Sequence, residues 1–230
     1  MTTAESDILT LDRKLDGVRF QYAFIGGAVL SLLVDDPEAD SIRVTKDVDV
    51  VMNIRTRAEY HAADEILSAL GFRHDTRDGA PICRWMCEGV TVDVLPMRGD
   101  VLGWDSKWFE EALGASVRIV RDGRPLNVVS APYFVALKLE AFESRGRRDF
   151  LMSSDFEDVI CLFNGRASIV GEIASCDPLR EPLSKKFAEY LKCPDLEDAV
   201  EGFVQTESNP ERRRKNIMSA FAAVGELHAP

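Results

Sequence analysis

Two aspartates stand one residue apart in the stretch TKDVDVV, where Asp47 and Asp49 interrupt a run of valines. The run is typical of a buried β-strand, in which alternate side chains face the same side. Val48 and Val50 would then face the core, and both carboxylates would project together from the other face. Two carboxylates so close repel each other, unless one takes up a proton or a cation lies between them. Because Mg²⁺ and Mn²⁺ prefer hard oxygen ligands, the pair predicts a divalent-metal site.

A third aspartate has a similar setting in the stretch VTVDVLPM. Val90, Val92 and Val94 would form one face of a second strand, and Asp93 would lie on the opposite face. If this strand neighbours DVDVV, the three acids form one cluster that can hold two metal ions. Such ions orient a nucleoside triphosphate and activate an attacking hydroxyl. On its own, a DxD pattern is more often a solvated acidic strand edge.

A glycine pair precedes the acids. The stretch FQYAFIGG predicts a short strand that ends at Gly26 and Gly27, and GAVLSLLV predicts a helix directly after them. Backbone N–H groups at such a turn can approach and bind phosphate oxygens. A plain tight turn accounts for most glycine pairs before helices. The ordered set of strand, glycine pair, DxD and a lone aspartate on a later strand is much more specific than any of its parts.

The elements that must position these residues change in character near residue 130. Before it, strands and helices alternate, and tight turns are expected at Glu88–Gly89 and Asp122–Gly123. From Ala131 onward the strand signals stop, and amphipathic segments predict helices. We therefore expect an α+β fold, with a small mixed sheet flanked by helices and then a helical second half.

Composition narrows the class of protein. The formal net charge of −11 over 230 residues argues against broad nonspecific binding of nucleic acid. Basic clusters remain at Ser144–Phe150 and Glu211–Asn216, and the second is more typical of a solvated helix face. Five cysteines without a CxxC pair predict free thiols. No run approaches ~20 apolar residues and the start is polar, so we expect a cytoplasmic protein without a membrane span.

The segments IGGAVLSLLV, RVTKDVDVVM and VTVDVLP together resemble the active-site pattern of the nucleotidyltransferase (polymerase-beta-like) superfamily. Within it, the chain is similar to the AbiEii-type group, which includes toxins of type IV toxin–antitoxin systems. The segment from Ala131 to Arg166 is similar to the lysine- and aspartate-bearing helices of that group. The resemblance implies a nucleotidyltransferase catalytic core in residues 1–130. It also implies a helical domain in residues 131–230 that completes the nucleotide cleft.

The resemblance assigns roles to the residues that match the pattern of the core. Gly26 and Gly27 take the place of the phosphate loop, and Asp47 and Asp49 take that of the metal-binding pair. Asp93 takes the place of the third acid, which acts as a base or orients the metal. The usual pair in the superfamily is glycine–serine, so the second glycine removes one hydroxyl from the loop.

The resemblance also implies a contact between Lys138 and the nucleotide phosphates, and places Asp155 and Asp158 in the acidic motif that follows. Lys138 stands between two leucines of an apolar helix, where a lysine needs either solvent or an anion. An ordinary lysine whose ammonium reaches solvent from a half-buried helix is the alternative.

Several charged residues near these motifs have two interpretations. Arg147 and Arg148 could reach a triphosphate or an RNA backbone, or pair with a nearby acid of the set Asp149, Asp155 and Glu157. Arg43 and Lys46 could balance the charge of the acidic pair. The acidic insertion DDPEAD, residues 35–40, predicts a loop at the mouth of the cleft that disfavours a strongly anionic acceptor.

The expected activity is a metal-dependent transfer of a nucleoside monophosphate from NTP to an acceptor hydroxyl. The resemblance implies an RNA acceptor, such as a tRNA 3′ end, and a cognate antitoxin as partner. The acidic composition suits a small cationic acceptor, such as an aminoglycoside, better than RNA. A nucleotide-binding module without turnover is the alternative from another class, and the presence of all three acids counts against it.

Overall fold

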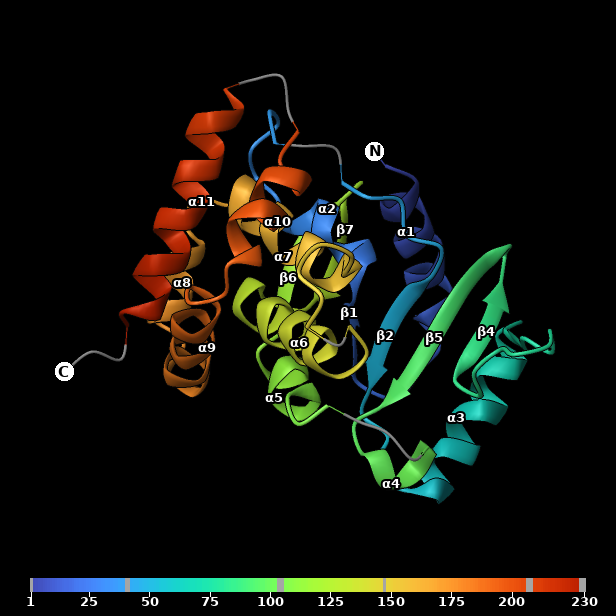
Figure 1. The fold of residues 1–230 in the computed structure, drawn as a ribbon. Helices are drawn as coiled ribbons and strands as arrows, with labels where there is room; N and C mark the ends of the chain where they lie inside the picture. The colour runs from blue at the N-terminus through green and yellow to red at the C-terminus, as the bar shows by residue number, and fades with distance from the viewer. Residues whose placement is uncertain (1, 40–41, 103–105, 147, 206–208, 228–230) are drawn as a thin grey trace. The chain divides into compact units, whose positions relative to one another are not determined.

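The computed structural model describes residues 2–39, 42–102, 106–146, 148–205 and 209–227. The chain forms two compact units. The first consists of Met1–Leu32 and Val44–Ser130, and the second of Leu33–Arg43 and Ala131–Pro230. The expected α+β class is confirmed, since a mixed sheet forms in the first unit and helices form the second (Figure 1). Segment 33–43 belongs with the helical unit, a placement that its position in the sequence did not predict.

In the described part of the chain, a seven-stranded sheet runs in the order β3-β4-β5-β2-β1-β7-β6. The strand bounds are Tyr22–Ile25 for β1, Val48–Met52 for β2, Arg73–His74 for β3, Arg84–Cys87 for β4, Val90–Pro96 for β5, Val117–Arg121 for β6 and Arg124–Val128 for β7. β2 pairs antiparallel with β1 and parallel with β5, so the sheet is mixed.

Two tight turns set the register of the hairpins. Glu88 and Gly89 have φ of 50° and 82°, and Asp122 and Gly123 have φ of 50° and 73°. Two successive residues with positive φ are typical of the type I′ turn, whose twist matches that of antiparallel strands. β4 therefore pairs with β5, and β6 with β7, as the sequence predicted.

Helix α1 (Thr3–Leu15) packs on the sheet of the first unit. Thr2 and Glu5 form a capping box at its start, which satisfies N–H groups that have no partner within the helix. Asp12 of α1 accepts a hydrogen bond from the Tyr22 hydroxyl and from the guanidinium of Arg124 on β7. These contacts hold α1 across β1 and β7.

Helix α3 (Arg57–Ala69) lies beside the β3–β4 hairpin (Figure 1). Its Tyr60 hydroxyl donates to the Ile82 carbonyl at 3.4 Å, and Asp64 contacts the ring of His74 at 2.6 Å. The remaining helices of this unit are short: η1 (Gly27–Val29), α2 (Leu30–Leu33), α4 (Gly99–Leu102) and α5 (Phe109–Gly114). The helix expected after the glycine pair is thus a 3₁₀ turn that continues into one α-helical turn.

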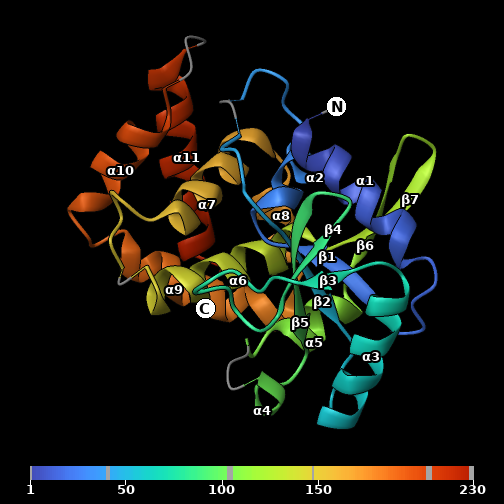
Figure 2. The same ribbon diagram turned by 90° about the vertical axis from the view of Figure 1, so that its right-hand side faces the viewer.

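The second unit is helical apart from its connecting loops (Figure 2). Its helices are α6 (Ala131–Ser144), α7 (Ser154–Gly165), α8 (Ile169–Ala174), α9 (Asp177–Tyr190), α10 (Asp195–Phe203) and α11 (Pro210–Gly225). Buried aromatic rings from α6, α7, α9 and α11 form its core: Phe142, Phe156, Tyr190 and Phe221. Within the described residues, no helix has the length and apolar character needed to cross a membrane.

Segment 33–43 is held to the helical unit by backbone and side-chain contacts. The N–H groups of Asp35 and Asp36 both donate to the Gly165 carbonyl, at 2.8 and 3.0 Å. Arg166 donates to the Leu33 carbonyl at 2.7 Å, and Arg213 donates to the Asp36 carboxylate at 2.9 Å. The acids of the insertion therefore neutralise arginines of the second unit.

Candidate functional site

The two acid-bearing strands are neighbours in the sheet. β2 and β5 pair in parallel, and their register places Asp49 beside Asp93. Neighbouring strands lie about 4.8 Å apart, so these two side chains project from adjacent positions. Asp47 stands immediately before β2. The structure thus brings together Asp47, Asp49 and Asp93, which we call the acidic cluster.

Arg84 lies on the acidic cluster. Its Nε and Nη2 donate to the two oxygens of Asp93 at 2.8 and 2.7 Å, and Nη2 also donates to Oδ2 of Asp47 at 2.6 Å. The hydrogen bonds to Asp93, followed by the charges of Asp93 and Asp47, outweigh burial and raise the pKa of Arg84. A bidentate arginine–carboxylate pair is a strong and geometrically specific contact. Two members of the cluster are therefore tied to one guanidinium.

One row across the sheet contains these groups. Arg84 on β4 stands opposite Asp93 on β5, Asp93 stands opposite Asp49 on β2, and Asp49 stands opposite Ile25 at the end of β1. Gly26 follows Ile25 directly. The order β4-β5-β2-β1 thus places a guanidinium, two carboxylates and the glycine turn on four successive strands.

The sequence analysis did not single out Arg84, although a signal for it exists. The Glu88–Gly89 turn was expected, and a two-residue turn fixes which residues of a hairpin face each other. Counting outward from that turn pairs Cys87 with Val90 and, three positions further, Arg84 with Asp93. The same side of the sheet then carries both side chains.

The donor atoms of the acidic cluster and their contacts decide whether it can hold a metal ion. Its carboxylate oxygens have the chemistry that Mg²⁺ and Mn²⁺ prefer. However, Arg84 holds both oxygens of Asp93 and one of Asp47. Among the described residues, no three acidic, histidine or cysteine side chains are grouped so that they could hold a metal ion. In this arrangement the cluster does not fit a divalent cation.

Gly26 adopts a conformation that only glycine tolerates well. Its φ of 74° and ψ of −169° lie in a region that is essentially restricted to glycine. A Cβ at this position would lie 2.8 Å from Cγ of Asp49, which is closer than van der Waals contact. The absence of a side chain therefore lets the Asp49 carboxylate lie against the glycine turn. Gly27 is buried and begins η1.

The thiol of Cys83 lies near the acidic cluster. Burial first, and then the negative charges of Asp93 and Asp49, raise its pKa to about 12. At neutral pH the thiol is therefore protonated and a weak nucleophile. All five cysteines are described by the structure and are free thiols, as expected.

Lys138, Asp155 and Asp158 also meet, in the second unit. The Lys138 ammonium lies 3.0 Å from Oδ1 of Asp155 and 2.6 Å from Oδ2 of Asp158. All three residues are buried, with 7%, 4% and 1% of their surface exposed. Burial lowers the pKa of Lys138, but the charges of Asp158 and Asp155 raise it by more. The contact between Lys138 and nucleotide phosphates stays a prediction, as do the nucleotide-binding roles of the two aspartates.

Arg145 completes this ion cluster from the end of α6. Its Nε and Nη2 donate to the two oxygens of Asp155, both at 2.9 Å. Burial raises the pKa of Asp155, but the hydrogen bonds from Arg145 and the charge of Lys138 lower it by more. Asp155 also lies in the first turn of α7, where the helix dipole favours a negative charge. The two carboxylates therefore hold α6 and α7 together.

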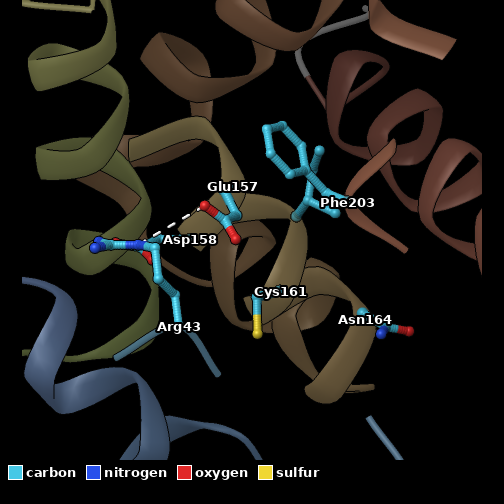
Figure 3. Close-up of a pocket in the computed structure, with 7 residues that line it drawn as sticks. Arg43, Glu157, Asp158, Cys161, Asn164 and Phe203 are labelled. Atoms are coloured by element: carbon cyan, nitrogen blue, oxygen red, sulfur yellow. Dashed lines mark hydrogen bonds and ion pairs between the residues drawn. The ribbon is translucent and has the colours of Figure 1, made fainter. Parts of the chain in front are cut away.

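By its place in the sequence Arg43 could balance Asp47 and Asp49, and in the structure it pairs with acids of the second unit. Its Nη2 lies 3.3 Å from Oδ2 of Asp158, and its Nε lies 3.7 Å from Oε2 of Glu157 (Figure 3). The physical reason is that segment 33–43 folds onto α7, so neighbours in sequence belong to different units. The cavity beside Arg43 has a volume of about 20 Å³. That volume suits about one water molecule, not a nucleotide.

A larger cavity of about 390 Å³ lies among α7, α8, α11 and residues of segment 33–43. Its lining includes Arg166, Arg213 and the apolar side chains of Phe163 and Ile217. None of the residues that the sequence analysis selected as site residues lines it. Arg166 pairs with Asp35 and Glu172, and Arg213 pairs with Asp36.

The other basic residues have contacts of their own. Arg148 pairs with Glu189 at 2.7 Å, rather than with the nearby acids that the sequence suggested. Arg147 lies outside the described residues, as does Asp40 of the acidic insertion.

We expect Gly26→Ala to destabilise the fold and displace the Asp49 carboxylate. The backbone strain and the contact with Asp49 together predict a loss of at least about 2 kcal/mol. Gly89→Ala is the matched control, because Gly89 also has positive φ but a Cβ there would meet nothing within 4 Å. Urea denaturation measures both. Equal losses in the two variants would show that the space beside Gly26 is not required.

We expect Asp155→Asn to cost roughly 3 kcal/mol at pH 7, because it leaves buried Lys138 with one carboxylate. The folded-state pKa of Asp155 is lowered, so its stabilisation is complete above the ordinary pKa near about 4. It is lost as the pH falls through the folded-state pKa. The difference from wild type should therefore shrink between pH 7 and pH 3.

Urea denaturation at both pH values tests this, with Asp177→Asn as control. Asp177 forms an exposed pair with Arg180 on α9, so its replacement should change stability little. A difference for Asp155→Asn that persists undiminished at pH 3 would contradict the assignment of this ion cluster.

The chain is similar to known proteins in structure but not in sequence. No protein-family model matches it, and no curated protein matches it in sequence. It is similar in structure to an antigenic nucleotidyltransferase-like protein from Paracoccidioides brasiliensis, with 19% identity over 94% of both chains and a TM-score of 0.49. It is also similar to the antibiotic-resistance factor ANT(2'')-Ia, with 17% identity over 70% of this chain and 80% of that chain, and a TM-score of 0.44. At these identities and TM-scores, neither likeness assigns the chain to a family.

Proposed function

We propose that this chain is a nucleotidyltransferase that moves a nucleoside monophosphate from NTP to an acceptor hydroxyl. One observation carries the proposal: the β2–β5 register places Asp49 beside Asp93, next to the glycine turn at Gly26. Asp47 joins them through its contact with Arg84. The order of glycine pair, DxD and third acid in the sequence supports the same class.

The reaction forms one bond and breaks one. The oxygen of the acceptor hydroxyl attacks the α-phosphorus of NTP, the bond from that phosphorus to the bridging oxygen breaks, and pyrophosphate leaves. Asp93 is the proposed acceptor of the hydroxyl proton, and its carboxylate keeps lone pairs beyond those that Arg84 uses. Gly26 and Gly27 are proposed to donate backbone N–H groups to phosphate oxygens.

Two further assignments belong to the proposal. Mg²⁺ or Mn²⁺ is the proposed cofactor, because such ions orient triphosphates in nucleotidyl transfer. Lys138 is proposed to contact the phosphates of the nucleotide, and Asp155 and Asp158 are proposed to take part in nucleotide binding. Its ammonium has three N–H donors, and two carboxylates lie within ion-pair distance.

The acceptor is proposed on separate grounds. The resemblance to toxins of type IV toxin–antitoxin systems supports an RNA acceptor, such as a tRNA 3′ end, and a cognate antitoxin as partner. The net charge of −11 favours a small cationic acceptor instead, since an acidic surface attracts cations. The pairing of Arg84 with two of the three acids favours a third candidate, a nucleotide-binding module without turnover.

We expect Asp49→Asn to reduce transfer at least about 100-fold while the fold persists, because the charge is lost and the shape is kept. Transfer is measured with each α-³²P-labelled NTP, Mg²⁺ and a cell extract, and folding by circular dichroism and thermal denaturation. Asp64→Asn is the control, because Asp64 pairs with His74 on the surface of the same unit. Transfer that survives in Asp49→Asn, or is absent from the wild type, would contradict the proposal.

The same assay distinguishes the acceptors. Label that appears in purified tRNA supports the RNA acceptor, and label that appears in an added aminoglycoside supports the cationic acceptor. NTP binding without labelled product in either case supports the module without turnover.

A further inference from the structure

Arg84 occupies the position at which a cation would have to bind the acidic cluster. Its guanidinium contacts three of the four oxygens that Asp47 and Asp93 present. Its side chain is 25% exposed, and those of Asp47 and Asp93 are 34% and 12% exposed. Dissolved salt screens contacts between partly buried charges much less than it screens surface ion pairs. The guanidinium thus already supplies a positive charge to these acids.

We propose that Arg84 is the resident counter-ion of the acidic cluster, and that a divalent cation binds Asp47 and Asp93 only in exchange for its guanidinium. This inference rests on the proposed function, because it concerns the same carboxylates. It resolves the disagreement between the donor chemistry of the cluster, which suits a divalent cation, and its present contacts, which do not.

The geometry requires that a metal ion replace the guanidinium, because the two cannot bind the same carboxylate oxygens together. Arg84 spans both oxygens of Asp93 with Nε and Nη2, and the shared Nη2 also reaches Asp47. A magnesium ion lies about 2.0–2.1 Å from its oxygen ligands. An ion on the same oxygens would place its two positive charges within a few ångströms of the guanidinium. Like charges at that distance repel strongly in a partly buried site.

The neighbourhood of Arg84 allows the side chain to leave without unfolding the sheet. Arg84 is the first residue of β4, and β3 pairs only with the two residues that follow it, Trp85 and Met86. Its carbonyl accepts a hydrogen bond from the N–H of Asp75, which holds the backbone of Arg84 in place. An arginine side chain can therefore rotate here while its backbone stays in register with Asp93.

The carboxylate of Asp75 lies near Arg84 and is already paired with Arg77, whose Nε and Nη2 donate to its two oxygens at 2.8 and 2.6 Å. Hydrogen bonds from Arg77 lower the pKa of Asp75 to about 2, and the charge of Arg84 contributes to the same shift. Asp75 is therefore ionised and already within the electrostatic reach of Arg84.

The first experiment measures Mn²⁺ affinity by electron paramagnetic resonance of the free ion, on the full chain without nucleotide. We expect Arg84→Gln to bind Mn²⁺ at least about tenfold more tightly than the wild type, because no guanidinium has to be displaced. Arg55→Gln is the matched control, since Arg55 is in the same unit but pairs with Glu110 at the surface. Equal or weaker affinity in Arg84→Gln, or no binding in any form, would overturn the inference.

The second experiment uses the wild-type protein and does not depend on the folding of a variant. The ¹⁵N-labelled Nε–H group of Arg84 donates to Asp93 and is assigned by the loss of its signal in Arg84→Lys. We expect this signal to shift or broaden as Mg²⁺ is added, while the Nε–H signal of Arg55 stays unchanged. An Arg84 signal that stays unaltered as Mg²⁺ is raised to about 20 mM would overturn the inference.

Neither readout requires nucleotidyl transfer. A failure of the proposed function can therefore be distinguished from a failure of the proposed exchange. If Mg²⁺ displaces Arg84 but no NTP is transferred to any acceptor, the proposed function is wrong and the exchange is right. If NTP is transferred while Mn²⁺ affinity is the same with and without Arg84, the function is right and the exchange is wrong.

Discussion

Compensation of negative charge inside the sheet is the constraint on which the first unit depends. β2 has strands on both sides, so Asp49 lies in the interior of the sheet with Asp93 on the next strand. A buried carboxylate without a partner costs several kcal/mol. Arg84 compensates Asp93 and Asp47 from β4, and Gly26 leaves room for Asp49 at the end of β1. The strand order β4-β5-β2-β1 therefore brings the acids together with the residues that accommodate their charge.

The strand faces and the hairpin turns were predictable from the sequence. The pairing of β2 with β5 was not, and entered the prediction only as a condition. Alternation along a strand placed Asp47 and Asp49 on one side, and glycine turns marked the hairpins, because both are properties of short segments. Parallel pairing joins residues 44 positions apart, such as Asp49 and Asp93, and is decided by the packing of the whole sheet. The sequence could therefore state what would follow if the two strands were neighbours, but not that they are.

Arg84 and Arg43 show that closeness in sequence is a poor guide to which charged residues pair. Arg43 is four residues from Asp47 but belongs to the helical unit, where it contacts Asp158. Arg84 is 37 residues from Asp47 and contacts it directly. The difference lies in hydrogen-bonded register: the turn at Glu88–Gly89 ties Arg84 to Asp93, whereas no strand pairing ties Arg43 to the sheet.

The two ion clusters of the chain differ in how completely their charges are enclosed. Lys138 in the second unit is buried between Asp155 and Asp158, and Arg145 and Arg43 also pair with these carboxylates. Displacing Lys138 would therefore remove the buried positive charge that lies between the two acids. The acidic cluster instead holds three carboxylates, and its guanidinium is a quarter exposed at the start of a strand. A partly exposed counter-ion can be exchanged at modest cost, whereas an enclosed one cannot. Chemistry that requires a change of cation is therefore compatible with the acidic cluster and not with the cluster around Lys138.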